Sequence, residues 1–221
     1  MKIIEPSFKF LRGKVPDGAE ILARIAEAGR VCYQSEPTTD DATFVRKLIE
    51  RGHESVLEHA SISVRVICDR GVTHETVRHR IASYSQESTR YCNYSKGKFG
   101  SEVPFIDISD GVTACPVTSQ LSEETKTLIV LEWWNACKDA ERHYMRMIEL
   151  GASPQIARSV LNSSTKTEIV MTYNVREWRH FFRLRCAPDA HPQMRQIANM
   201  LLKGFRECIP VVFDDIEVGP E

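Results

Sequence analysis

The densest group of side chains able to bind an anion lies between Glu75 and Tyr91. This stretch contains three arginines, one histidine and three serines. Each guanidinium offers five donors in a planar fork that suits a phosphate or a carboxylate, and His79 adds a donor that can become charged. An ordinary helix surface or turn carries far fewer such groups, so the stretch predicts a bound, negatively charged ligand.

Arg78 and Arg80 carry most of this prediction, and their spacing restricts how they can act. In a helix, residues two apart point about 200° apart, so these side chains cannot both close on one small ligand. They should serve two ligands, or two parts of one long ligand. From Ser85 onward the apolar period is lost, and we expect a polar loop that wraps a phosphate with Arg90 as counter-charge. The alternative is a solvated basic face followed by a surface loop, the commoner fate of an isolated Arg-x-Arg motif.

The order of these residues adds information that their charge alone does not give. Arg78-His79-Arg80, followed after seven residues by Ser88 and then by Arg90-Tyr91, resembles the signature of the flavin-dependent thymidylate synthases. The chain is similar to the family over roughly residues 20 to 205. The other segments that fall in the family's order are Gly52–His59, Ile81–Tyr84, Ala157-Arg158, Thr172–Arg176 and Leu184-Arg185.

The resemblance implies reductive methylation of dUMP to dTMP, with methylenetetrahydrofolate as carbon donor, FAD as hydride carrier and NADPH as reductant. No protein nucleophile attacks the base in this family, so the protein's contribution is orientation and electrostatics. The residues implied for FAD are Ser55, Arg78, His79, Arg80, Gln86, Asn174, Arg176 and His180. His180 departs from the asparagine that is common in the family at this position.

The resemblance also implies a set of residues for dUMP, and three candidate catalytic residues. The substrate set is Glu75, Arg78, Gln86, Glu87, Ser88, Thr89, Arg90, Arg158 and Arg185. Arg185 should polarise the pyrimidine and favour loss of the N3 proton, and Ser88 and His53 are the other catalytic candidates. A structural hydrogen bond is the alternative role for His53. Glu75 stands where the family commonly has glutamine, and Ser85-Gln86 replaces an Asn-Glu pair seen in some members.

The resemblance further implies a homotetramer in which neighbouring subunits complete each active site. Gln86 to Arg90 and Arg158 would come from one chain, and Glu75, Arg78 and Arg185 from its neighbour. This assembly fits the spacing argument, because Arg78 and Arg80 facing apart can serve one composite site when a second chain completes it. We expect dUMP, folate, NADPH and a second copy of the chain as partners.

Two other functions compete with this interpretation. A non-catalytic nucleotide- or RNA-binding module would explain Arg78 to Arg90, but it gives no reason for Arg158, Asn174, Arg176 and Arg185. A metal-dependent hydrolase built on His53 and His59 fails because these histidines are six apart, whereas a zinc-binding helix needs them four apart. We therefore expect no metal.

Composition restricts the class of protein. The 221 residues carry a net charge of −1, and no repeat or Pro/Gly-rich linker divides them, so we expect one domain over residues 1–221. The near-neutral charge argues against a nucleic-acid partner.

The N-terminus lacks the apolar core of a signal peptide, and no run approaches the roughly 20 apolar residues of a membrane helix, so we expect a cytoplasmic protein without a membrane partner. The seven cysteines contain no Cys-x-x-Cys pair and indicate reduced thiols, with Cys32 as a buried small residue.

The elements that must position these residues follow from periodicity and end signals. Strands are expected in residues 1–12, 61–68, 103–108 and 167–173. Helices are expected over 19–31, from Asp40 or Asp41 to Gly52, over 72–82, over about 122–150, from Ser153, through His180 and Arg185, and over about 193–207. The fold class is therefore α+β, a mostly antiparallel sheet flanked by helices. The acidic tail beyond Pro210 should be peripheral.

Overall fold

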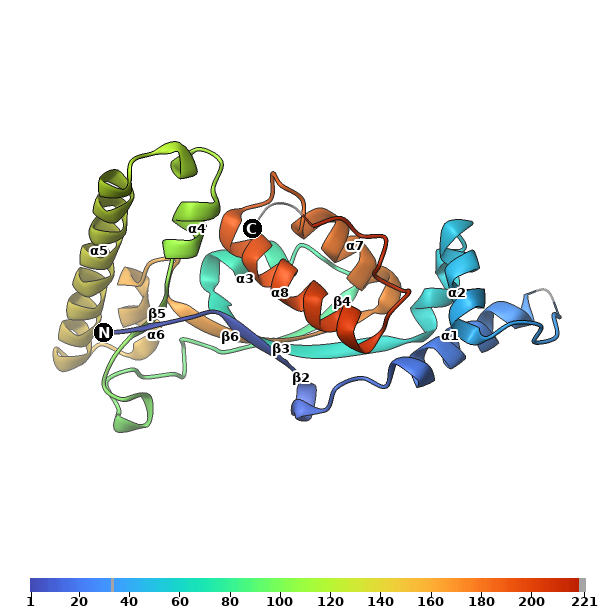
Figure 1. The fold of residues 1–221 in the computed structure, drawn as a ribbon. Helices are drawn as coiled ribbons and strands as arrows, with labels where there is room; N and C mark the ends of the chain where they lie inside the picture. The colour runs from blue at the N-terminus through green and yellow to red at the C-terminus, as the bar shows by residue number, and fades with distance from the viewer. Residues whose placement is uncertain (33, 219–221) are drawn as a thin grey trace.

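The computed structural model describes residues 1–32 and 34–218 and contains a four-stranded antiparallel sheet at its centre (Figure 1). Alternating apolar and polar residues in the two long central strands favour a sheet with one buried face. The strand order is β2-β3-β6-β4, with bounds Ser7–Phe10, Ser61–Asp69, Lys166–Asn174 and Ala82–Gln86. A separate parallel pair joins β1 (Lys2–Ile4) to β5 (Pro104–Ile106).

Two helices cover the apolar face of this sheet, α7 (Val175–Arg185) and α8 (Pro192–Cys208) (Figure 1). The sheet contributes alternate residues of β3 and β6 to the core, among them Val64 and Met171, which are paired across the two strands. Five fully buried aromatic residues fill the space between the helices and the sheet: Trp178, Phe181, Phe182, Phe205 and Phe213. Aromatic rings of this size supply most of the buried apolar area of such a core.

A helical extension lies beyond one end of the sheet and consists of α1 (Gly18–Val31), α2 (Asp41–Glu50) and the 3₁₀ helix η2 (Glu54–His59). Asp17 and Asp40 cap the two α-helices through their side chains. Gly52 adopts a φ of +72° just after α2, a conformation that suits glycine, and the chain then turns into η2. The expected helix boundaries in this region are confirmed.

The other end of the molecule is organised by the long helix α5 (Glu123–Glu149), which packs its own small core (Figure 1). Tyr94, Phe105, Cys137 and Tyr144 are buried in this second core. The shorter elements nearby are α4 (Ser109–Ala114), α6 (Pro154–Ala157), η3 (Gly97–Phe99), η4 (Thr118–Gln120) and η5 (Arg158–Val160), while η1 (Leu11–Gly13) follows β2. The α+β class with a mostly antiparallel sheet is confirmed.

The helix expected over residues 72–82 is wrong. Helix α3 spans Arg70–Thr76, and the chain then leaves it through tight turns to enter β4. The Tyr84 hydroxyl lies 2.8 Å from the carbonyl oxygen of Thr76 and 2.6 Å from that of His79, which satisfies backbone groups at the end of the helix. The polar loop expected from Ser85 is likewise wrong at its start, because Ser85 belongs to β4 and pairs with β6.

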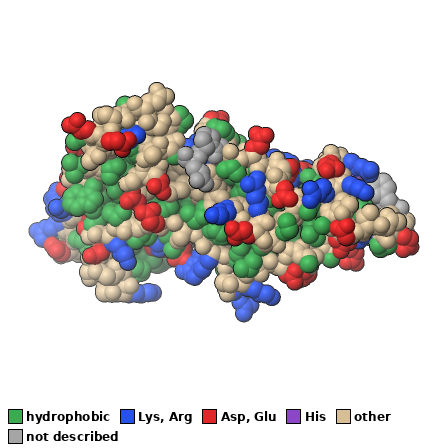
Figure 2. Space-filling view, in the orientation of Figure 1, with side chains coloured by type: hydrophobic (Ala, Val, Ile, Leu, Met, Phe, Trp, Pro, Cys, Tyr) green, Lys and Arg blue, Asp and Glu red, His purple; other side chains and the backbone are tan. Residues whose placement is uncertain are grey.

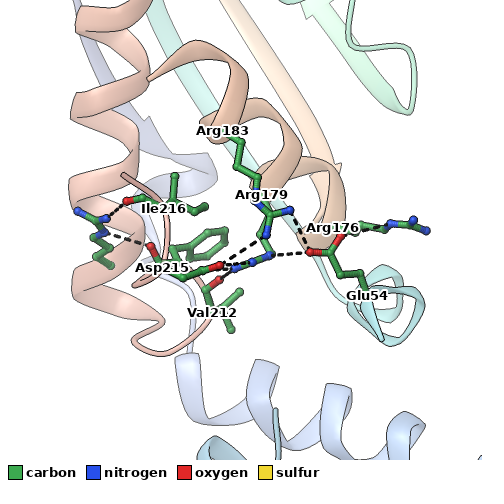
Figure 3. Close-up of polar contacts among 9 residues, drawn as sticks. Glu54, Arg176, Arg179, Arg183, Val212, Asp215 and Ile216 are labelled. Atoms are coloured by element: carbon green, nitrogen blue, oxygen red, sulfur yellow. Dashed lines mark hydrogen bonds and ion pairs between the residues drawn. The ribbon is translucent and has the colours of Figure 1, made fainter. Parts of the chain in front are cut away.

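The tail is not peripheral within the described residues. Val212, Phe213 and Ile216 are buried in the main core. Asp215 holds the fully buried Arg179 through two hydrogen bonds of 2.7 Å, as Figure 3 shows. Arg179 lowers the pKa of Asp215, so the pair is ionised at neutral pH.

The surface agrees with a nearly neutral chain. Acidic and basic side chains are interspersed over the face drawn in Figure 2, without one continuous basic area. Cys32 is exposed, so its expected burial is wrong, and the seven cysteines are free thiols. None of the helices in the described part of the chain is long and apolar enough to cross a membrane.

Candidate active site

His79 is the centre of a buried polar cluster between β4 and α7. Its side chain is 2% exposed, and its Nδ1 lies 3.0 Å from Oε1 of Glu177. Arg185 donates its Nε–H to Nε2 of the same ring over 3.2 Å. Because Nε2 accepts, we assign the ring proton to Nδ1, which donates to Glu177. Burial lowers the pKa of His79, the hydrogen bond with Glu177 opposes that shift, and the nearby Arg185 charge adds to it. The imidazole is therefore neutral at pH 7.

Arg185 is fixed on its other side by the end of α3. Its Nη1 lies 2.7 Å from Oε2 of Glu75, and its Nη2 donates to the Glu75 carbonyl over 3.1 Å. His191 approaches the second carboxylate oxygen of Glu75 at 3.2 Å. The structure thus brings together Glu75 and Arg185, both implied for dUMP.

A cavity of about 250 Å³ opens beside this cluster. It is lined by Arg78, His79, Arg80, Ile81, Glu177, His180, Leu184 and Arg185. Among the described residues, no carboxylate pairs with the exposed guanidinium groups of Arg78 and Arg80. Ile81 is 67% exposed and Leu184 is 49% exposed, so apolar surface accompanies the two free cations. This donor set fits a cofactor that combines phosphate groups with a flat ring system.

The other residues implied for FAD lie along η2 and the start of α7. Ser55 is exposed on η2, directly after Glu54, and His53 is the residue that precedes this helix. Asn174 caps α7, because its Oδ1 accepts the N–H of Glu177 over 2.8 Å. The position of Asn174 follows from the junction between the end of β6 and the start of α7.

Arg176 differs from Arg78 and Arg80 because carboxylates already hold it. Its Nη1 lies 2.6 Å from Oε1 of Glu58, and its Nε lies 3.9 Å from Glu54. Glu54 also contacts Arg179 and Arg183, so one carboxylate faces three arginines of α7 (Figure 3). The two carboxylates therefore compensate part of the Arg176 charge, which weakens its attraction for a cofactor phosphate.

A second group of predicted residues lies at the opposite end of α3. Arg158 donates to Oγ1 of the buried Thr89 over 3.2 Å. Both line a cavity of about 430 Å³, together with Arg70, Gln155, Ser159 and Leu161. Just after Thr89, the Arg90 guanidinium stacks over the Tyr91 ring at 5.3 Å, and the Arg90 N–H donates to the Ser88 hydroxyl over 3.4 Å.

Gln86 and Glu87 point into the protein between the two groups. The Gln86 amide donates to Thr73 and Thr167 over 3.0 and 3.1 Å. Glu87 forms an ion pair of 2.6 Å with Lys166 and accepts the Tyr94 hydroxyl over 3.2 Å. These bonds hold the end of β4 and so fix the position of the turn that follows it. A ligand that contacts Gln86 or Glu87 has to compete with these bonds.

The two groups lie at the two ends of one short helix. Helix α3 carries Arg70 at its start and Glu75 near its end, and its seven residues extend about 10 Å. No hydrogen bond or ion pair joins the two groups within the part of the chain that the structure describes. One chain thus offers two separate groups of cations. The expectation that Arg78 and Arg80 face apart on a helix is wrong, because both follow the end of α3 and line the same cavity.

Sequence reasoning missed Glu177, His191 and Arg70. Glu177 has a detectable signal, since it lies three residues after the capping Asn174, but nothing in the sequence shows that it reaches His79. The nearest ligand atoms of His79, Glu177 and His180 all lie within 4.8 Å of one another. Both ring nitrogens of His79 are already engaged. The absence of a metal stays a prediction.

Comparisons with known proteins give the family of the chain. The family model described as "Thymidylate synthase complementing protein" matches residues 17–211. The chain is 34% identical over 207 residues to a flavin-dependent thymidylate synthase of Geobacter sulfurreducens, covering 89% of this chain and 82% of the relative. It is 36% identical over 206 residues to the one of Mycobacterium sp. (strain JLS), with 90% and 81% covered. The fold matches the UMP/dUMP methylase PolB from Streptomyces cacaoi, bound with 5-Br dUMP, with a TM-score of 0.78 at 23% identity over 97% and 96% of the two chains.

Proposed function

Because the chain belongs to the flavin-dependent thymidylate synthase family, we propose that it methylates dUMP to dTMP, using methylenetetrahydrofolate as carbon donor and NADPH as reductant. Family membership makes it an enzyme and a flavoprotein, and it favours this function over a non-catalytic nucleotide- or RNA-binding module. The observation that carries the proposal is the buried His79 and the fixed Arg185 beside a cavity whose Arg78 and Arg80 pair with no carboxylate among the described residues. PolB, a structural neighbour, is a UMP/dUMP methylase bound with a dUMP analogue, which supports the choice of nucleotide.

We assign the flavin to FAD, which when bound supplies the hydride that reduces the transferred carbon to a methyl group. Arg78 and Arg80 supply charge-assisted donors for its phosphates, since no carboxylate among the described residues holds them. Ile81 and Leu184 offer apolar surface at the same cavity. The other residues assigned to FAD are Ser55, His79, Gln86, Asn174, Arg176 and His180.

Arg185 is assigned to the pyrimidine ring of dUMP. Its guanidinium is 14% exposed and is fixed by Glu75 and His79, so it needs no rearrangement to meet negative charge on the ring. Glu75 partly compensates its charge. The 5′-phosphate is assigned to Ser88, Thr89, Arg90 and Arg158. Gln86 and Glu87 hold the end of β4 and thereby fix the turn that carries Ser88 to Arg90.

We propose that the enzyme is a cytoplasmic homotetramer of single-domain chains and that neighbouring subunits share each site. The separation of the Arg185 group from the Arg158 group within one chain supports this arrangement. Arg78 is assigned to both ligands and would contact the nucleotide as well as the flavin. His53 and Ser88 are the further catalytic candidates.

The proposal is tested with purified protein incubated with dUMP, methylenetetrahydrofolate, NADPH and FAD. We expect dTMP by chromatography, and loss of product when any one component is omitted. Arg80→Ala should purify folded with much less flavin, because losing a charge-assisted hydrogen bond costs about 1.5 to 3 kcal/mol, or roughly ten- to a hundredfold in affinity. Arg24→Ala is the matched control, since Arg24 lies on the surface of α1 paired with Glu20. Full flavin occupancy in folded Arg80→Ala would remove Arg80 from the site.

A further inference from the structure

Asp215, in the C-terminal segment, faces two arginines of helix α7 (Figure 3). Each of its carboxylate oxygens accepts a hydrogen bond of 2.7 Å from the Arg179 guanidinium. Nη2 of Arg183 lies 3.5 Å from Oδ2 of the same carboxylate. Arg179 is fully buried, and a buried guanidinium that loses its carboxylate is strongly unfavourable. The carboxylate of Asp215 therefore determines how the Arg179 guanidinium is oriented.

The same two arginines contact Glu54, the first residue of η2, on their other side (Figure 3). Nη1 of Arg183 lies 3.0 Å from Oε1 of Glu54, and Nε of Arg179 lies 3.5 Å from the same oxygen. Arg179 and Arg183 are four residues apart and so lie on one face of α7. They stand between a carboxylate of the C-terminal segment and a carboxylate of η2, so a shift of the arginines would move Glu54.

Helix η2 is attached to α7 at both of its ends, but by different contacts. Near its end, Arg176 pairs with Glu58 over 2.6 Å, and the Val175 N–H donates to the Ala60 carbonyl over 2.9 Å. At its start, Glu54 supplies the ion pairs with α7. The backbone of α7 thus fixes the end of η2, whereas the position of its start depends on side chains that Asp215 orients.

We propose that Asp215 is a positioning residue for flavin binding. It orients Arg179 and Arg183, and these arginines hold the start of η2 through its first residue. Ser55, assigned to the flavin under the proposed function, is the second residue of η2, and the inference rests on that assignment. The C-terminal segment supplies none of the described residues that line the cavity assigned to the flavin, so its effect reaches the flavin through α7 and η2.

A purely electrostatic role of these carboxylates predicts the opposite effect from a positioning role. The phosphates of FAD are anions, so removal of a nearby negative charge should strengthen FAD binding if charge alone matters. In Asp215→Asn, Glu54 is the carboxylate left to the buried Arg179 among the described residues. We expect Glu54 to be drawn toward Arg179, which displaces Ser55 and weakens FAD binding.

The test is a titration of flavin-free protein with FAD, followed by the quenching of flavin fluorescence. We expect the Kd for FAD to rise about tenfold in Asp215→Asn and in Glu54→Gln. The double variant should be no weaker than the weaker single variant, because both substitutions act through the same arginines. Glu217→Gln is the matched control, since it removes a carboxylate from an exposed position in the same segment, and its Kd should be unchanged.

A second control separates positioning from loss of stability. Ile216 is buried in the main core, so Ile216→Ala should lower the Tm. Its Kd for FAD, measured at a temperature where it is folded, should equal that of wild type. If Asp215→Asn does not fold, Glu54→Gln is judged by the same Kd, because its side chain is 21% exposed.

The titration needs no nucleotide, so it is independent of the proposed reaction. Weaker FAD binding by Asp215→Asn and Glu54→Gln in a protein that forms no dTMP would support the positioning role while the proposed reaction fails. FAD binding as tight as in wild type, or tighter, in folded Asp215→Asn would overturn the proposal. Additive losses in the double variant, or an equal loss in Ile216→Ala, would overturn it as well.

Discussion

The arginines of the candidate site differ in whether a carboxylate already holds them. Arg185 and Arg176 are paired with Glu75 and Glu58, whereas Arg78 and Arg80 have no such partner among the described residues. A paired guanidinium is fixed in direction, which suits a group that must meet charge developing on the base. An unpaired one keeps its full charge for a phosphate. Pairing therefore separates Arg185, assigned to the base, from Arg78 and Arg80, assigned to the flavin phosphates, whereas Arg176 is paired although it is assigned to FAD.

This division predicts different kinetics for two substitutions. Arg158→Ala should chiefly raise the KM for dUMP, because phosphate binding does not change during the reaction. Arg185→Ala should also lower kcat, since it removes stabilisation of charge on the ring. Oxidation of NADPH in the absence of dUMP should survive both. Steady-state kinetics with dUMP as the varied substrate measures the difference, and a change in KM alone for Arg185→Ala would refute its electrostatic role.

A pH dependence follows from His79. Burial lowers its pKa in the folded protein, whereas in the unfolded chain His79 gains a proton as the pH falls through about 6.5. Below that pH the unfolded state binds more protons, so the free energy of unfolding should decrease from about pH 7.5 to about pH 5.5. Glu177, Arg185 and His180 face the ring.

Urea denaturation of the flavin-free protein at the two pH values measures this effect. In His79→Gln the part of the decrease due to His79 should disappear, while in His59→Gln, at an exposed position, it should remain. Equal pH dependence in wild type and His79→Gln would show that His79 is not held neutral.

At the scale of elements, the junction of α3 and β4 decides where Arg78, His79 and Arg80 lie. The strands at 61–68 and 167–173 could be predicted because strict alternation of apolar and polar residues indicates a strand with one buried face. The end of α3 could not, because residues 72–82 also show helical spacing. What ends the helix is Tyr84, whose hydroxyl reaches back to two carbonyls, and such a contact across a turn has no signal in local sequence.

Tyr84→Phe should therefore weaken this junction. Losing the hydroxyl removes the one proton that the carbonyl groups of Thr76 and His79 share, and leaves a part-buried acceptor unsatisfied at a cost of about 1–3 kcal/mol. We expect a lower denaturation midpoint and reduced flavin retention, because the turn that carries Arg80 loses its support. Tyr91→Phe, at a position 78% exposed, is the matched control. Equal midpoints and flavin content in wild type and Tyr84→Phe would mean that the hydroxyl is dispensable.

At the scale of the whole molecule, the C-terminal segment shows the limit of composition as a guide. Its acidic residues suggested exposure, yet Val212 and Phe213 complete the main core and Asp215 neutralises the buried Arg179. The resemblance implies the candidate site residue by residue, and the roles of these residues stay predictions. The partners of those residues, Glu177 for His79 and Glu58 for Arg176, could not be predicted, because they depend on the packing of distant segments.

The shared-site proposal belongs to the same scale. At dUMP concentrations near the wild-type KM, Arg90→Ala and Arg185→Ala should each have little activity. If a site draws these residues from different subunits, some sites in mixed oligomers contain neither substitution. With random assortment, about a quarter of sites should be intact in a closed symmetric oligomer. Differently tagged, co-purified hybrids are assayed for dTMP. Activity no higher than that of the parents would place Arg90 and Arg185 in one subunit's site.

The central claim is that a flavin bound beside Arg80 and Arg185 carries the hydride to the nucleotide, and a single turnover tests it most directly. The protein is reduced with NADPH without oxygen, freed of excess reductant, and mixed with dUMP and methylenetetrahydrofolate. We predict about one dTMP per reduced flavin, formed together with the return of oxidised-flavin absorbance, and none from flavin-depleted Arg80→Ala. Formation of dTMP while the flavin stays reduced, or equal dTMP from the flavin-depleted variant, would contradict the account.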